Sequence, residues 1–344
     1  MLSNTRVSKR KGKPAILTRT TPNIKEGHSV HLSLHDAQEY VYAHKQAEGL
    51  RPRTLEGYRI YFGMLVDWLA EHYPNIENIT QVTTIVVRDY ILYLSNTHVN
   101  QRTGEIGLSP HTINISIRLL KAFFNVLFQE EIIDKNPMRS IKFMRADEDT
   151  FKPLTDDEIK RLLNTPDVKY FAQFRDLVSI YLILDTGIRS SEMFSLEMGD
   201  IDFKSRAIYL PASKTKNRKP RVLPLSNKVM RLLLELITEV KANFDTSYVF
   251  VSNFGEKYLP TSFRRRLHIY KNKSNIDKPV NAHGLRHQFC RDYIMNGGDI
   301  FSLQRIAGHS DISTTRKYIQ FTTDDIKKKH AQFSPIGNIR SKYR

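Results

Sequence analysis

The amino-acid sequence predicts a mainly α-helical protein with a small antiparallel β-sheet, in which an N-terminal helical domain precedes an α+β domain. Three observations carry this prediction. The length of 344 residues exceeds what one ordinary small domain needs. Apolar residues recur at helical spacing along most of the chain from residue 33 onward. Three short segments instead alternate between apolar and polar residues, as strands do: 201–203, 206–210 and 221–225.

The N-terminal domain is expected at residues 31–145, after a basic arm. Residues 1–30 are rich in lysine and arginine, hold almost no acid and cannot bury a core, so we expect them to be disordered. Ser109 and Pro110 mark the start of one helix, and Thr54 is expected to cap another. Two further helices complete a small four-helix bundle and are expected at 34–48 and 82–95.

The second domain is expected at residues 154–332, after a linker at 146–153 that is polar and lacks periodicity. Thr155 and Glu158 form a capping box, which indicates that a helix begins there. Residues 333–344 are expected to be a C-terminal tail. Further helices of this domain are predicted at 226–243, 261–272, 284–295 and 311–320.

Composition limits the function classes. The chain holds 53 lysines and arginines against 36 acidic residues, a net charge of +17 that favours a nucleic acid or an anionic membrane as partner. A basic protein with neither partner stays open as an alternative. No run of 18 uncharged apolar residues is present, so no membrane span is expected. The single cysteine, Cys290, excludes an intrachain disulfide and is interpreted as a packing residue, which suits a cytoplasmic protein.

The residues that carry chemistry stand in short motifs of the second domain. Arg189 follows Thr-Gly-Ile, Arg286 lies in His-Gly-Leu-Arg-His, His309 follows a glycine, and Tyr318 follows Thr-Thr-Arg-Lys. Cleavage of a phosphodiester without metal needs neutralisation of the phosphate charge, a proton acceptor and a proton donor. Arginines hold phosphate oxygens in a planar fork. A tyrosine, with a free pKa of about 10, attacks phosphorus only beside a base and cations.

Each of these residues also has an ordinary interpretation, because most tyrosines pack in cores and most arginines meet solvent. A zinc site is considered for His283 and His287, which share one helical face at a spacing of four. Gly284 stands where the metalloprotease motif has its glutamate. No zinc, other metal or cofactor is therefore expected.

Taken in order, the motifs resemble those of the tyrosine recombinase family, which includes phage integrases and the Xer enzymes, over about residues 33–332. The resemblance implies that two arginines bind the scissile phosphate and that one histidine accepts the proton of a tyrosine nucleophile. It also implies that a second histidine hydrogen-bonds a non-bridging oxygen. The two arginines are Arg189 and Arg286, and the tyrosine is Tyr318. The proton acceptor is His283, and the second histidine is His309.

The resemblance also assigns supporting roles. Glu192 resembles an acid that orients the active-site cations, and His287 is expected to be structural. A lysine between the last two strands is expected to protonate the 5′-oxygen. Lys214 fits the Ser-Lys-Thr form best, while Lys216 and Lys219 are expected to contact backbone phosphates. Four basic residues on polar faces of the first domain meet phosphates or solvent: Arg51, Arg53, Arg118 and Lys121.

The function implied by the resemblance is site-specific recombination of DNA, without metal or ATP, through a 3′-phosphotyrosyl intermediate and a Holliday junction. The implied partners are double-stranded recombination sites and further copies of this chain. A dimer is expected on each site and a tetramer in the synapse, and accessory DNA-bending proteins are possible further partners. Integration, excision and resolution stay open as tasks, for a mobile element or for chromosome or plasmid dimers. The alternatives are a type IB topoisomerase and a non-catalytic DNA-binding regulator; the presence of Arg189, Arg286 and Tyr318 disfavours the regulator.

Overall fold

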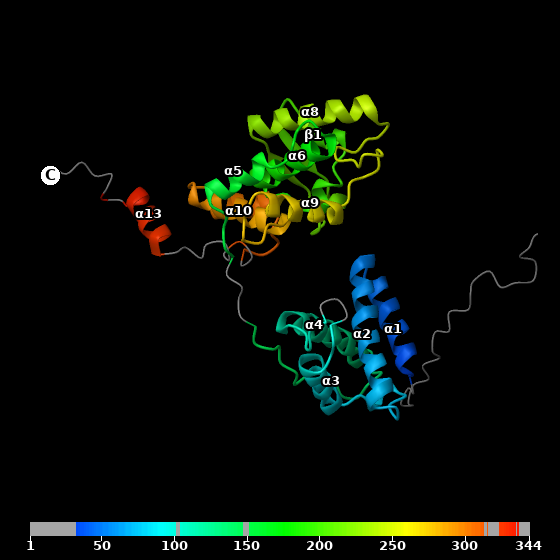
Figure 1. The fold of residues 1–344 in the computed structure, drawn as a ribbon. Coiled ribbons are helices and arrows are strands. Elements are labelled where there is room, and N and C mark those ends of the chain that lie inside the picture. Colours follow the sequence, from blue (N-terminus) through cyan, green and yellow to red (C-terminus); the bar gives the residue numbers. More distant parts are fainter. Residues whose placement is uncertain are drawn as a thin grey trace, which may run out of the picture. The chain divides into compact units, whose positions relative to one another are not determined.

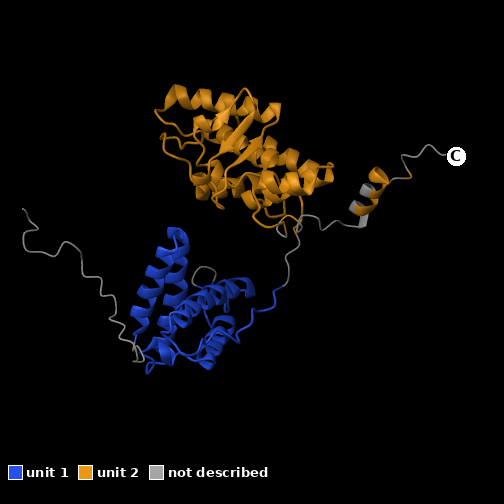
Figure 2. Ribbon diagram, turned by 180° about the vertical axis from the view of Figure 1, so that it is seen from behind, with its two compact units in different colours: residues 1–148 blue, residues 149–344 orange. Residues whose placement is uncertain are grey.

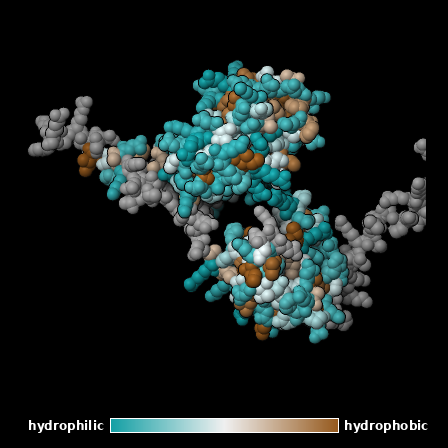
Figure 3. Space-filling view, viewed as in Figure 1, coloured by the Kyte–Doolittle hydropathy of each residue, from teal (hydrophilic) through white to brown (hydrophobic). Residues whose placement is uncertain are grey.

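The computed structural model describes residues 32–100, 104–146, 151–312, 315, 323–334 and 336. The chain divides into two compact units, residues 1–148 and 149–344 (Figure 2), and each unit has its own apolar core. The basic arm predicted at residues 1–30 lies outside the described residues, as do residues 147–150 of the predicted linker. The visible face of each unit is mostly hydrophilic, with scattered apolar side chains (Figure 3).

The first unit is the predicted helical bundle. Its helix α4 (Pro110–Gln129) begins as expected, because the Ser109 hydroxyl accepts the backbone N–H of Thr112 and Pro110 occupies the first turn. The prediction that Thr54 caps a helix is wrong, since that helix already begins at Pro52, whose fixed φ suits a first turn. The remaining elements are α1 (Leu34–Ala47), α2 (Pro52–His72), a 3₁₀ turn (Ile79–Gln81) and α3 (Thr84–Asn96).

The second unit is the predicted α+β domain, with helices around one small sheet (Figure 1). Strands β1 (Ile201–Asp202), β2 (Ala207–Leu210) and β3 (Arg221–Pro224) pair antiparallel in that order. The predicted capping box of Thr155 and Glu158 is present at the first helix. The helices are α5 (Asp156–Asn164), α6 (Phe171–Thr186), α7 (Ser190–Met193), α8 (Asn227–Asn243), α9 (Pro260–Lys273), α10 (Ala282–Met295), α11 (Ile300–Ala307) and α13 (Thr323–Phe333).

Helix α6 is central to this unit, because it packs against both α8 and α10 (Figure 1). It ends at Gly187, whose φ of 62° is left-handed. A Cβ at Gly187 would lie 2.4 Å from the ring of Phe289 in α10. Glycine is therefore required both by the turn and by the close approach of α10. The turn brings Arg189 beside the end of α11.

Helix α11 is absent from the sequence prediction. The Asp299 carboxylate caps it by accepting the backbone N–H groups of Phe301 and Ser302, and the helix ends at Gly308 with a φ of 66°. The helix predicted at 311–320 lies mostly outside the described residues.

Two expectations from composition can be compared with the structure. Cys290 is buried in α10, as expected of a packing residue, and burial raises the pKa of its thiol to about 11. Among the helices of the described ranges, none combines the length and apolarity that crossing a membrane requires.

Candidate active site

The two arginines predicted from the motifs both donate hydrogen bonds to carbonyl groups at the end of α11. Arg189 donates from Nη1 to the Ala307 carbonyl at 3.3 Å and from Nη2 to the Gly308 carbonyl at 3.1 Å. Arg286, on α10, donates from Nη2 to the same Ala307 carbonyl at 2.7 Å and from Nη1 to the Gly187 carbonyl. A helix C-terminus carries partial negative charge, so it is a favourable place to hold guanidinium groups.

A third arginine, Arg221 at the start of β3, joins the same helix end. Its Nε donates to the Ile306 carbonyl at 3.1 Å, and its side chain is only 7% exposed. Arg221 has no role in the sequence prediction. Strand periodicity carries a signal for it, because Arg221 falls on the same face as the fully buried Leu223. A buried charged residue at such a position needs a partner.

Glu192, on α7, is the carboxylate that Arg189 and Arg221 share. Its Oε1 accepts from Nη1 of each arginine at 3.2 Å, and its Oε2 accepts from Nη2 of Arg221 at 2.5 Å. Burial alone would raise the pKa of Glu192, but the hydrogen bond and charge of Arg221, followed by the charge of Arg189, hold that pKa below its usual value. Glu192 is therefore an ionised carboxylate between two cations.

His309 is buried and lies in hydrogen-bond contact with Arg286. Its Nε2 lies 2.8 Å from Nη2 of Arg286, and its Nδ1 lies 2.9 Å from the hydroxyl of Thr315. A guanidinium group can only donate, so Nε2 accepts and Nδ1 carries the proton. Burial, and then the charges of Arg286 and Arg189, lower the pKa of His309 to about 4. The ring is therefore neutral near pH 7.

His283 and His287 lie in the first two turns of α10, with their ring centroids 4.1 Å apart. Burial, and then the charges of Arg286, Arg189 and Lys216, lower the pKa of His283. Burial, and then the charges of His283 and Arg286, lower the pKa of His287 to about 4. Both rings are neutral near pH 7, and a neutral imidazole is able to accept a proton.

The two candidate lysines of the β2–β3 loop differ in their surroundings. Nζ of Lys214 lies 2.6 Å from Oδ2 of Asp200 and 3.3 Å from Oε1 of Glu197, so this ammonium is held by two carboxylates. Lys216 has an exposed side chain, and its charge contributes to the lowered pKa of His283. Its backbone N–H lies 3.5 Å from Oε1 of Glu192. Lys216 is thus the lysine that accompanies the arginine and histidine cluster.

The other predicted positions are distributed over both units. Arg51 and Arg53 are exposed at the start of α2, and Arg118 and Lys121 lie on α4 beside the ring of Phe143. Lys219 is exposed in the β2–β3 loop. Tyr318 lies outside the described residues.

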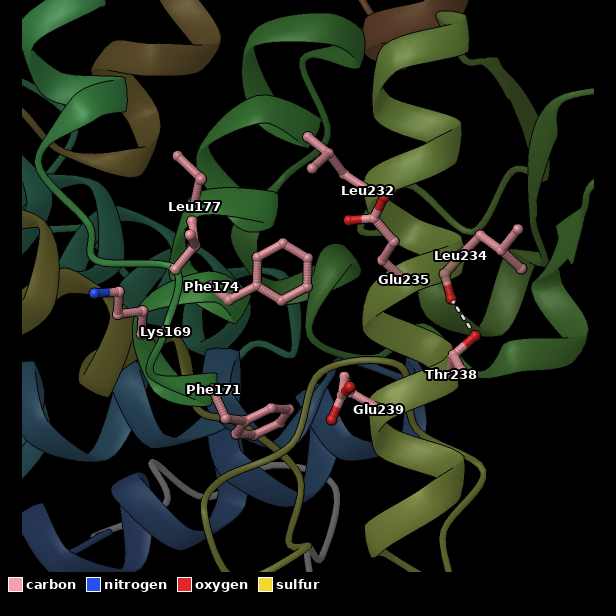
Figure 4. A pocket seen from close by; sticks show the side chains of 10 residues that line it. Lys169, Phe171, Phe174, Leu177, Leu232, Leu234, Glu235, Thr238 and Glu239 are labelled. Carbon is pink, nitrogen blue, oxygen red and sulfur yellow. Dashed lines mark hydrogen bonds between the residues drawn. The ribbon is translucent and has the colours of Figure 1, made fainter.

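A separate hollow of about 780 Å³ lies between α6 and α8 (Figure 4). Phe171, Phe174 and Leu177 line it from α6, and Leu232 and Glu235 line it from α8. None of the clustered arginines or histidines belongs to this lining, so the hollow is distinct from the candidate site. Across the described residues, no three His, Cys, Asp or Glu side chains come together as a metal-ligand set.

The half-buried His287 and the buried His309 predict a dependence of stability on pH. The pKa of His287 and of His309 is about 4 in the folded chain and about 6.5 in an unfolded one, so folding favours the neutral rings. Their contribution is present above pH ~6.5 and is lost as the pH falls toward ~4. Thermal unfolding followed from pH 7.5 to 5 should show this loss, and His287→Asn should reduce it. Equal slopes for both proteins would contradict the assignment.

The second unit thus places two arginines beside neutral histidines, a set of side chains suited to binding a phosphate ester and accepting a proton. Comparison with known families defines the class of protein. Residues 152–324 match the phage integrase family, and residues 33–144 match the phage integrase SAM-like domain. The chain therefore belongs to the phage integrase family of tyrosine recombinases, and the resemblance drawn from the motifs is confirmed.

Curated relatives include XerD of Listeria innocua, 28% identical over 234 residues that cover 67% of this chain and 78% of the relative. XerC of Myxococcus xanthus is 26% identical over 311 residues, which cover 88% and 99%. Among solved structures, the Tn1549 transposon integrase with a circular intermediate DNA has a TM-score of 0.71 at 20% identity, covering 88% of this chain and 99% of that one. XerH bound to palindromic difH has a TM-score of 0.65 at 17% identity, covering 87% and 84%. These structures share the fold.

Proposed function

We propose that this chain exchanges strands between specific DNA sites, with Tyr318 as the nucleophile of a 3′-phosphotyrosyl intermediate. The observation that carries the proposal is the convergence of Arg189 and Arg286 on the carbonyls that end α11. Tyr318 follows Thr315, the buried partner of His309, by three residues. Three residues of chain span at most about 10 Å, so this tyrosine has the reach to meet the cluster.

Phosphate binding is assigned mainly to Arg189. Its side chain is 24% exposed and its guanidinium points N–H groups at backbone carbonyls. A phosphate oxygen accepts more strongly than a carbonyl because it is charged, so it can replace these acceptors. Arg286 is almost fully buried and holds His309 and the α11 terminus, so it fixes the other side of the phosphate site. Two fixed cations stabilise the additional negative charge of the pentavalent transition state.

Proton transfer is assigned to His283 and Lys216. His283 is neutral near pH 7 and lies at the N-terminus of α10, where it can accept the tyrosine proton. Lys216 replaces Lys214 as the proposed donor to the leaving 5′-oxygen, because Lys214 is held by Asp200 and Glu197. To reach the leaving oxygen, Lys214 would first have to give up both of these ion pairs.

A phosphotyrosine bond preserves the energy of the cleaved phosphodiester, so a 5′-hydroxyl from another strand can rejoin the DNA without ATP. We propose a dimer on each site, a tetrameric synapse and a Holliday junction as the setting of this exchange. The named relatives are Xer recombinases and a transposon integrase. We propose integration, excision or resolution as the task, with accessory DNA-bending proteins as further partners. The family match to both units disfavours a topoisomerase and a non-catalytic regulator.

The test begins with the DNA site, mapped by footprinting the purified protein on DNA that flanks its gene. Two direct copies of this site are then placed on a supercoiled plasmid. Recombination should divide the plasmid into two circles, and a plasmid without sites should stay supercoiled. Relaxation of the site-free plasmid at the same rate, without new circles, would instead support the topoisomerase alternative.

Cleavage is expected to survive metal removal. The proposed charge stabilisation comes from the guanidinium groups of Arg189 and Arg286, which take the place of a metal ion. The rate of covalent adduct formation in excess EDTA should therefore stay within about twofold of the untreated rate. Activity that is lost in EDTA and restored only by Mg²⁺ or Zn²⁺ would contradict this prediction.

A further inference from the structure

We propose that Arg221 is a positioning residue that serves as the counter-ion of Glu192 and so leaves the positive charge of Arg189 available to the scissile phosphate. This inference rests on the proposed function, because it concerns how the phosphate-binding arginine is kept active. Arg221 would act through Glu192 and would not itself touch the DNA.

The contacts of Glu192 are unequal, and this inequality supports the assignment. Arg221 donates from Nη2 to Oε2 at 2.5 Å and from Nη1 to Oε1 at 3.2 Å. This bidentate arrangement is the strongest for an arginine and a carboxylate. Arg189 contributes one side-chain contact at 3.2 Å and its backbone N–H at 3.2 Å. Its other guanidinium contacts go to the Ala307 and Gly308 carbonyls.

Burial explains why Glu192 needs this second cation. The side chain of Glu192 is 1% exposed and that of Arg221 is 7% exposed, whereas that of Arg189 is 24% exposed. A buried carboxylate is costly unless it is paired and hydrogen-bonded. Without Arg221, the nearest remaining side-chain cation contact of Glu192 would be Arg189. A closed Arg189–Glu192 pair would be neutral and would bind a phosphate poorly, whereas two arginines sharing one carboxylate keep one net positive charge.

A second contact shows how tightly Arg221 is built into the cluster. A Cβ at Gly308 would lie 2.9 Å from Nη1 and 3.0 Å from Cζ of Arg221. Glycine at this position therefore leaves room for the guanidinium, in addition to permitting the left-handed φ. Together with the Nε contact to Ile306, this packing joins β3 to the end of α11.

The experiment measures single-turnover covalent cleavage at saturating DNA, together with DNA affinity and thermal unfolding. Arg221→Met keeps an unbranched apolar stem, shorter than that of arginine, and removes the charge. We expect cleavage about 100-fold slower, comparable to losing one transition-state hydrogen-bond donor. Arg221→Lys should cleave within about tenfold of the wild-type rate, because it retains the charge.

Adding Glu192→Gln to Arg221→Met should raise the cleavage rate at least about tenfold above that of Arg221→Met alone, because a neutral amide no longer competes for Arg189. Arg231→Met, on α8, removes a like charge elsewhere and should match wild type.

The double variant separates the counter-ion role from simple packing. If Arg221 only packs, removing both partners should be no better than Arg221→Met alone, and that result would overturn the inference. If the Arg221→Met protein is unstable, the comparison can still be made, because Arg221→Lys and the double variant bury no unpaired charge. A folded Arg221→Lys protein that cleaves as slowly as Arg189→Ala would also contradict the inference. If wild type forms no covalent adduct, the proposed function fails before this question arises.

Discussion

Tyr318→Phe is expected to bind DNA with wild-type affinity and to form no covalent adduct. Phenylalanine retains the aromatic ring but lacks the oxygen that would bond to phosphorus, so the loss should be complete. The assay uses a suicide substrate nicked close to the cleavage position, from which the short fragment diffuses away and traps the intermediate. Adduct is measured as a shifted band in a denaturing gel, and DNA affinity is measured separately.

The matched control is a tyrosine outside the site, Tyr209→Phe, on an exposed position of β2. This variant should trap adduct as wild type does. An undiminished adduct from Tyr318→Phe would remove Tyr318 from the nucleophile role. Loss of adduct accompanied by loss of DNA binding would indicate that the tyrosine matters for binding, and the nucleophile assignment would then lack support from this variant.

Lys216→Ala is expected to slow cleavage by about 10²–10⁴-fold, the usual contribution of a positioned general acid. A substrate with sulfur at the 5′-bridging position should restore the rate. A thiol has a pKa of about 8.5, so a thiolate departs without needing a proton. The same substrate should not rescue Arg189→Ala, whose defect is the loss of charge stabilisation.

Lys214→Ala is the comparison that decides between the two lysines. It removes the partner of Asp200 and Glu197, so we expect some loss of stability and a much smaller loss of cleavage rate than for Lys216→Ala. If sulfur rescues Lys214→Ala and fails with Lys216→Ala, the proton donor is Lys214, as the sequence motif suggested. The ion pairs of Lys214 would then have to open when DNA binds.

Features with local signals were predictable from the sequence. Ser109 with Pro110, and Thr155 with Glu158, each place a helix start within a few residues, because the capping partners are neighbours in the chain. The strands were found by their alternation. The prediction for Thr54 was wrong because this short segment holds two residues that can start a helix, Pro52 and Thr54. The helix begins at the proline. Helix α11 was missed although Asp299 and Gly308 mark both of its ends.

The assembly of the site depends on partners distant in the chain, and these the sequence does not specify. The motifs predicted that Arg189 and Arg286 belong to the site. They did not predict that both arginines donate to the carbonyl groups at the end of α11. Arg221 lies 29 positions from Glu192, so no local pattern joins them. The choice between neighbouring lysines depends on Asp200 and Glu197, which come close to Lys214 only in the folded chain.

The most direct test of the account is to identify the atoms that join protein to DNA. Wild-type adduct from the suicide substrate is digested with trypsin and nuclease, and the modified peptide is sequenced by mass spectrometry. The account predicts one modified residue, Tyr318, carrying a nucleotide through a 3′-phosphate. A nucleotide on another residue, a linkage through a 5′-phosphate, or cleavage without any covalent peptide would contradict the account.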